Sequence, residues 1–138
     1  MENSKSVAVL GGGSFGTVLA NLAASNGYNV SLWVRDSEQA LRINSEGANT
    51  TYHPELKLSK NIIASDNLKE VLNNKSIIFI STPSIVFEQI VIRVSDYIDE
   101  KPYLVSWTKG ILDDPFRPLS EIISSKLKNT IGVLSGPN

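Results

Sequence analysis

The residues best suited to chemistry form a glycine-rich run, Gly11-Gly12-Gly13-Ser14-Phe15-Gly16, which follows a short apolar stretch at positions 7–10. Such a stretch is typical of a buried strand. After the run, apolar residues recur at the spacing of a helix, at Phe15, Val18, Leu19, Leu22 and Ala23, and Gly27 stands where a C-terminal cap would. The pattern G-x-G-x-x-G between a strand and a helix predicts a dinucleotide-binding site.

Each glycine of this pattern has its own physical role. Gly11 allows a tight turn, Gly13 lets the backbone approach a diphosphate, and Gly16 lets the helix pack close to the strand. The exposed N–H groups at the start of the helix, around Ser14 and Phe15, would then face the phosphates. The alternative is a glycine-rich turn that binds nothing, and the flanking strand and helix argue against it.

Strand and helix patterns alternate along the rest of the chain. We expect strands at 7–10, 30–34, 61–64, 77–80, 103–107 and 131–134. Asp36 or Ser37 can cap the second helix, the third begins near Ser65 or Asp66, and the last begins between Asp114 and Pro118. The polar stretch 47–60 reads as a long connection, of a kind that is often functional. This order predicts an α/β fold: a single-domain, three-layer, doubly wound parallel sheet of the Rossmann type.

Ligands of such sheets bind beyond the carboxyl ends of the strands, so the turns that follow the strands should form the site. These turns are 11–16, 35–36, 81–84, 108–110 and 135–138. At the end of the second strand an acidic residue favours NAD, whereas an arginine accommodates the 2′-phosphate of NADP. Arg35 precedes Asp36 there, so we favour NADP(H), with NAD(H) as the alternative.

Three further residues have a functional and a plain structural interpretation. Pro83 would give a rigid apolar wall for a nicotinamide ring, or simply begin a helix. Lys109 would supply a cation to a phosphate or to a carbonyl oxygen that gains charge, or be an ordinary exposed lysine. His53, the single histidine, is expected to be a surface residue, and we expect no metal site.

The composition limits the class of protein. A chain of 138 residues is long enough for one domain with its own core. The net charge of −1 gives no reason to expect nucleic acid or an anionic membrane as a partner. The absence of cysteine is compatible with a reducing compartment, the first residues are polar, and no apolar run approaches the length of a membrane span. We therefore expect a cytoplasmic location.

The assembled motifs resemble those of the bacterial NAD(P)-dependent glycerol-3-phosphate dehydrogenases. The resemblance runs through the whole chain in order. It rests on the glycine run with Thr17, on Leu32-Trp33-Val34-Arg35-Asp36, on Thr82-Pro83-Ser84, on Trp107-Thr108-Lys109-Gly110 and on Leu134-Ser135-Gly136-Pro137. The T-K-G and S-G-P motifs are much more specific to the family than the glycine run. They argue against another two-domain dehydrogenase.

The resemblance implies roles for individual residues. Ser14, Phe15 and Arg35 would contact the cofactor, and Lys109 would touch both cofactor and substrate. Gly136 and the position two beyond it would belong to the substrate site. That second position is commonly Ser or Thr in the family and is Asn138 here, which can still donate and accept hydrogen bonds.

The resemblance also implies what lies outside residues 1–138. Family members continue into a helical second domain that carries the general acid/base lysine and the groups for the substrate phosphate. The complete enzyme would interconvert dihydroxyacetone phosphate and glycerol 3-phosphate for phospholipid synthesis. We expect the present chain to bind the cofactor, to catalyse little, and to self-associate as a homodimer through apolar faces near Asn138. The alternative is a stand-alone NAD(P)H-binding module, which the reading frame beyond codon 138 would distinguish.

Overall fold

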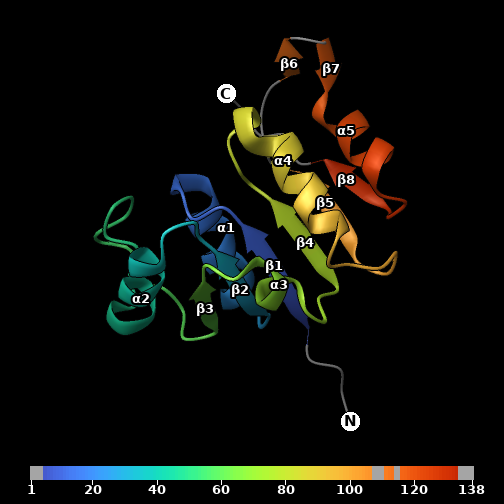
Figure 1. Cartoon of the computed structure of the whole chain (residues 1–138). Coiled ribbons are helices and arrows are strands. Elements are labelled where there is room, and N and C mark those ends of the chain that lie inside the picture. The colour runs from blue at the N-terminus through green and yellow to red at the C-terminus, as the bar shows by residue number, and fades with distance from the viewer. Residues whose placement is uncertain (1–4, 107–110, 114–115, 134–138) are drawn as a thin grey trace.

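Strands and helices alternate along the chain, as the sequence pattern predicts (Figure 1). The computed structural model describes residues 5–106, 111–113 and 116–133. The elements are β1 (Ser6–Leu10), α1 (Ser14–Ser25), β2 (Asn29–Trp33), α2 (Ser37–Glu46), β3 (Ile62–Ser65), α3 (Leu68–Leu72), β4 (Ile77–Ile80), α4 (Ser84–Ser95), β5 (Tyr103–Ser106), β6 (Ile111–Asp113), β7 (Phe116–Pro118), α5 (Leu119–Lys126) and β8 (Ile131–Val133).

Six of the strands form one parallel sheet in the order β3-β2-β1-β4-β5-β8. Val7 of β1 pairs with Val30 of β2 on one side and with Ile77 of β4 on the other. The chain therefore builds the sheet outward from β1 to β3 and then returns to place β4 beside β1. The prediction of a doubly wound α/β sheet is confirmed. Its ligand-binding crevice is expected at this reversal of strand order.

Helices cover both faces of the sheet, which gives three layers (Figure 1). Alternate residues of β1 enter different cores, because successive side chains of a strand point to opposite faces. Val7 and Val9 pack with α1 and α2, whereas Ala8 and Leu10 pack with α3, α4 and α5. Burial on both faces explains why the central strands are continuous apolar runs rather than alternating ones.

Helix α1 buries its small residues and leaves its large apolar residues partly in solvent. Its buried positions are Gly16, Thr17, Ala20 and Ala24, whereas Leu22 is 60% exposed. A Cβ atom on Gly16 would lie 1.7 Å from the carbonyl oxygen of Gly11, so the helix touches the loop backbone at this point. The apolar spacing predicts the helix correctly. The size of the side chains determines which face of α1 packs against the sheet, because only small residues allow this close approach.

The boundaries differ from the sequence-based expectation in two places. Asp36 caps α2 as predicted, but Asn67 caps α3, one or two residues later than expected. The antiparallel pair β6 and β7 was not predicted, and α5 begins only at Leu119, after this hairpin. The expectation that the last helix begins between positions 114 and 118 is therefore wrong. The expected ends of two strands, at positions 107 and 134, lie outside the described residues.

Candidate functional site

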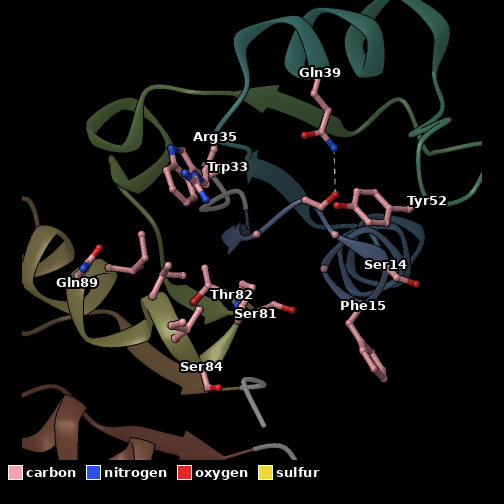
Figure 2. A pocket seen from close by; sticks show the side chains of 18 of the residues that line it. Ser14, Phe15, Trp33, Arg35, Gln39, Tyr52, Ser81, Thr82, Ser84 and Gln89 are labelled. Atoms are coloured by element: carbon pink, nitrogen blue, oxygen red, sulfur yellow. Dashed lines mark hydrogen bonds between the residues drawn. The ribbon is translucent and has the colours of Figure 1, made fainter. Parts of the chain in front are cut away.

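A cavity of about 780 Å³ lies at the carboxyl ends of β1, β2 and β4, where the strand order reverses (Figure 2). Its walls are the glycine loop at 11–16, the end of β2 with Arg35, the turn 81–84 and part of α4. Three of the five turns expected to form the site therefore meet around one space. The other two, 108–110 and 135–138, lie outside the described residues.

Most of the predicted site residues line this cavity. They are Gly11, Gly13, Ser14, Phe15, Gly16, Arg35 and Pro83. The remaining predicted residues, Lys109, Gly136 and Asn138, lie outside the part of the chain that the structure describes. The cofactor and substrate roles assigned to all of these residues stay predictions.

The glycines of the loop differ in why the fold needs them. Gly11 has a φ of +120°, and a Cβ atom there would lie 2.6 Å from the carbonyl oxygen of Ser81. Both the turn and the neighbouring strand therefore require glycine at this position. Gly13 is the N-cap of α1 with a φ of −79°, and no atom lies within 4 Å of where its Cβ would be. Nothing among the described residues requires a glycine there.

Side chains distant in sequence hold the backbone of the glycine loop. Asn49 Nδ2 donates to Gly12 O at 2.7 Å and to Thr17 Oγ1 at 2.8 Å. Gln39 Nε2 donates to the same Gly12 oxygen at 3.2 Å (Figure 2). Thr17 Oγ1 donates in turn to Gly13 O at 2.7 Å. These contacts join α2 and the 47–60 connection to the loop, and no local sequence pattern indicated them.

His53 is partly exposed, in agreement with the expected surface position, but its ring also contacts the glycine loop. Its Nε2 lies 3.0 Å from both Ser14 Oγ and Ser14 O, at the first residue of α1. A carbonyl oxygen only accepts hydrogen bonds, so the contact with Ser14 O assigns the proton to Nε2. With Nε2 as the donor, the hydroxyl proton of Ser14 is left for another acceptor.

Two arginines bring positive charge to the cavity: Arg35 follows β2, and Arg93 belongs to α4. The Arg93 guanidinium lies 5.5 Å from the ring centre of Trp33. Asp36 instead caps α2, since its Oδ1 accepts a hydrogen bond from the backbone N–H of Glu38 at the start of that helix. An arginine, rather than the neighbouring carboxylate, is thus the charged residue that this turn contributes to the wall.

The turn after β4 adds a rigid residue and an unsatisfied one. Pro83 is the N-cap of α4, so it begins a helix, and it also lines the cavity. Its role beside a nicotinamide ring stays a prediction. The hydroxyl of Thr82 is buried and has no hydrogen-bond partner among the described residues. Figure 2 shows Thr82 between the glycine loop and the start of α4. A buried hydroxyl without a partner is costly and is found more often at functional sites.

Comparison with known proteins identifies the family. A family model described as the N-terminus of NAD-dependent glycerol-3-phosphate dehydrogenase matches residues 6–138. The chain belongs to this family. A glycerol-3-phosphate dehydrogenase [NAD(P)+] of Alcanivorax borkumensis is 42% identical over 138 residues, which are 99% of this chain and 40% of that protein. The resemblance of the sequence motifs to this family is confirmed.

Solved structures give the same result for the fold. The glycerol-3-phosphate dehydrogenase of Coxiella burnetii superimposes with a TM-score of 0.90 at 32% identity, covering 97% of this chain and 41% of that chain. The Saccharomyces cerevisiae enzyme superimposes with a TM-score of 0.89 at 27% identity, covering 99% of this chain and 43% of that chain. The chain thus spans about two fifths of the length of these relatives. Within the described residues, no helix combines the length and apolarity needed to cross a bilayer.

Proposed function

We propose that the cavity at the ends of β1, β2 and β4 binds a nicotinamide dinucleotide, with NADPH favoured and NADH as the alternative. One observation carries the proposal. Gly13 has a backbone conformation open to any residue and free space around its missing side chain. A glycine that the fold does not need leaves room for a group from outside, and in this strand–loop–helix context that group is a diphosphate.

The surroundings of Gly13 fit an anion. The backbone N–H groups of Gly13 and Ser14 have no acceptor among the described residues, and both lie at the N-terminus of the twelve-residue helix α1. A helix start combines free N–H groups with the positive end of the helix dipole, which stabilises negative charge.

Arg35 supports the preference for NADPH. Its guanidinium is the charged group that the end of β2 contributes to the cavity, whereas Asp36 caps α2. A planar guanidinium can bind a phosphate with two parallel hydrogen bonds, so it would hold a 2′-phosphate on the adenosine ribose. Isothermal titration of the chain with NADPH and NADH tests this assignment. We expect tighter binding of NADPH and loss of that preference in Arg35→Ala, with NADH affinity nearly unchanged. An unchanged preference in Arg35→Ala would remove Arg35 from this role.

For the longer proteins of this family we propose the reversible reduction of dihydroxyacetone phosphate to glycerol 3-phosphate, as part of phospholipid synthesis. The bound nicotinamide would supply the hydride. Lys109, Gly136 and Asn138 would contact the substrate, as the resemblance implies. The general acid/base lysine and the substrate-phosphate site are expected in the helical second domain of those longer proteins. Residues 1–138 by themselves would therefore bind the cofactor without reducing the substrate.

The apolar faces near Asn138, through which we expect self-association, lie outside the described residues. Exposed apolar residues on one side of the sheet offer a second candidate surface. Leu22 of α1 and Tyr103 of β5 are 60% and 56% exposed, and a groove of about 480 Å³ runs between α1 and β4, lined in part by Ile77 and Phe79. Large exposed apolar patches are typical of interaction surfaces. We propose a homodimer that could form through this side of the sheet. We also propose a cytoplasmic location.

A further inference from the structure

The carbonyl oxygen of Gly12 is fixed by two side-chain amides from outside the glycine loop. Asn49 Nδ2 donates to it at 2.7 Å and Gln39 Nε2 at 3.2 Å. Asn49 is only 1% exposed, and all of its amide hydrogen-bonding groups have partners in this network. Its Nδ2 also donates to Thr17 Oγ1 at 2.8 Å, and its Oδ1 accepts from Gln39 Nε2 at 3.2 Å. This network therefore holds the orientation of the Gly12–Gly13 peptide.

The geometry of the peptide bond means that the held Gly12 carbonyl also sets the direction of the Gly13 N–H. In a planar trans peptide the C=O and the N–H point in opposite directions. Because the Gly12 oxygen is drawn toward Asn49, the N–H of Gly13 points away from Asn49, and Gly13 itself lines the cavity. The Gly13 oxygen is likewise held by Thr17 N at 3.0 Å and Thr17 Oγ1 at 2.7 Å, which directs the N–H of Ser14 outward.

We propose that Asn49 is a positioning residue for the cofactor's diphosphate. It contacts no ligand itself. It acts through the Gly12 carbonyl and the Thr17 hydroxyl, so that the N–H groups of Gly13 and Ser14 face the phosphate oxygens before the ligand arrives. Donors that are fixed in advance bind more tightly, because no free energy is lost in ordering them. This inference rests on the proposed function of the cavity.

Asn49 also ties the 47–60 connection to the same end of α1. Its carbonyl oxygen accepts hydrogen bonds from the backbone N–H groups of Tyr52 at 3.1 Å and His53 at 2.8 Å. That turn places the His53 ring against Ser14. One turn of the connection thus contacts the glycine loop at Gly12 through Asn49 and at Ser14 through His53, which explains why a long polar loop lies here.

A matched control is available in Asn44. Its side chain also makes two backbone hydrogen bonds, donating to Ala64 O at 2.9 Å and accepting from Ala64 N at 2.8 Å. Both bonds are to β3 and neither involves the glycine loop. Removing either asparagine side chain should lower the thermal stability of the chain, because each side chain makes at least two hydrogen bonds that would be lost. Only the loss of Asn49 should change ligand binding.

The test compares NADPH dissociation constants of the wild-type chain, Asn49→Ala and Asn44→Ala, with circular dichroism to confirm that each is folded. For Asn49→Ala we expect the NADPH dissociation constant to rise at least about tenfold, because the hydrogen bonds to the charged diphosphate would lose their alignment. For Asn44→Ala we expect less than about a twofold change. Equal affinities of folded Asn49→Ala and wild type would overturn the inference. So would an equal loss of affinity in Asn44→Ala.

A second measurement covers the case in which Asn49→Ala does not fold. Titration with inorganic pyrophosphate should shift the amide NMR resonances of Gly13 and Ser14 in the wild type and in Asn44→Ala. In Asn49→Ser, which keeps a shorter polar side chain, these shifts should be lost or much reduced, and unchanged shifts would refute the role of Asn49. If the wild type binds neither NADPH nor NADH, the proposed function itself fails. If it binds and only the asparagine comparison fails, the cofactor site stands without this positioning residue.

Discussion

Alanine at Gly13 should weaken cofactor binding by about a hundredfold and leave the fold nearly as stable as before. The backbone at this N-cap has a φ of −79°, and the added methyl group would meet no atom within 4 Å. Alanine is a poorer N-cap than glycine by up to about 1 kcal/mol, but it also lowers the entropy of the unfolded chain by a similar free energy. The two effects nearly cancel, so we expect a net change in stability below about 1 kcal/mol.

The cost to the ligand is larger. A methyl group at Gly13 would occupy the space through which a diphosphate reaches the N–H groups of Gly13 and Ser14. Two hydrogen bonds to a charged group, each contributing about 1.5 kcal/mol, amount to about 3 kcal/mol. At about 1.4 kcal/mol per factor of ten, this is a loss of about a hundredfold in affinity. NADPH titration by calorimetry measures this loss directly.

Alanine at Gly16 is the matched control for stability, since it should destabilise the fold where Gly13→Ala does not. Its Cβ would lie 1.7 Å from Gly11 O, where ordinary contact begins at 3.4 Å, so the backbones would have to separate by about 1.7 Å. Overpacking of this kind costs about 1–3 kcal/mol or more, and the melting temperature should fall by about 10 °C. The reasoning fails if Gly13→Ala binds NADPH within threefold of wild type. It also fails if Gly13→Ala melts as early as Gly16→Ala.

Two further predictions concern polar groups whose environment is unfavourable. Thr82→Val should leave the melting temperature unchanged or raise it, because the change removes a buried hydroxyl without a partner. Thr17→Val should lower the melting temperature, because it breaks two hydrogen bonds of the Thr17 hydroxyl. Equal losses of stability in the two variants would contradict this expectation. Burial lowers the pKa of Lys75 below its ordinary value, so the unfolded chain binds more protons there and wild-type stability should rise relative to Lys75→Gln as the pH increases toward 10. Thermal unfolding of both proteins from pH 7 to 10 measures this, and parallel curves would show that Lys75 is not responsible.

Local sequence patterns were sufficient for the main elements of the fold. The glycine run, the buried strand at 77–80 and the capping residue Asp36 each act over a few neighbouring residues. The hairpin of β6 and β7 was missed because its two strands have only three residues each, too short for a recognisable alternation. The buried face of α1 could not be predicted from its apolar residues, because the small residues of this helix, and not its large apolar ones, pack against the sheet.

The candidate site was predictable where one turn contains all the information. Gly11, Gly13 and Arg35 each lie within three residues of the end of a strand, so the rule for parallel sheets places them correctly. The contributions of Asn49 and His53 depend on where the 47–60 connection folds back over α1, which no local pattern specifies. Asparagine and histidine in a polar loop are usually solvated, and only the three-dimensional contacts distinguish these two.

The most direct test of the account is a crystal structure of the chain grown with NADPH at saturating concentration. We expect density for the diphosphate against the N–H groups of Gly13 and Ser14 at the start of α1, with the adenosine end toward Arg35. A cofactor bound elsewhere, or no cofactor at the glycine loop under these conditions, would contradict it.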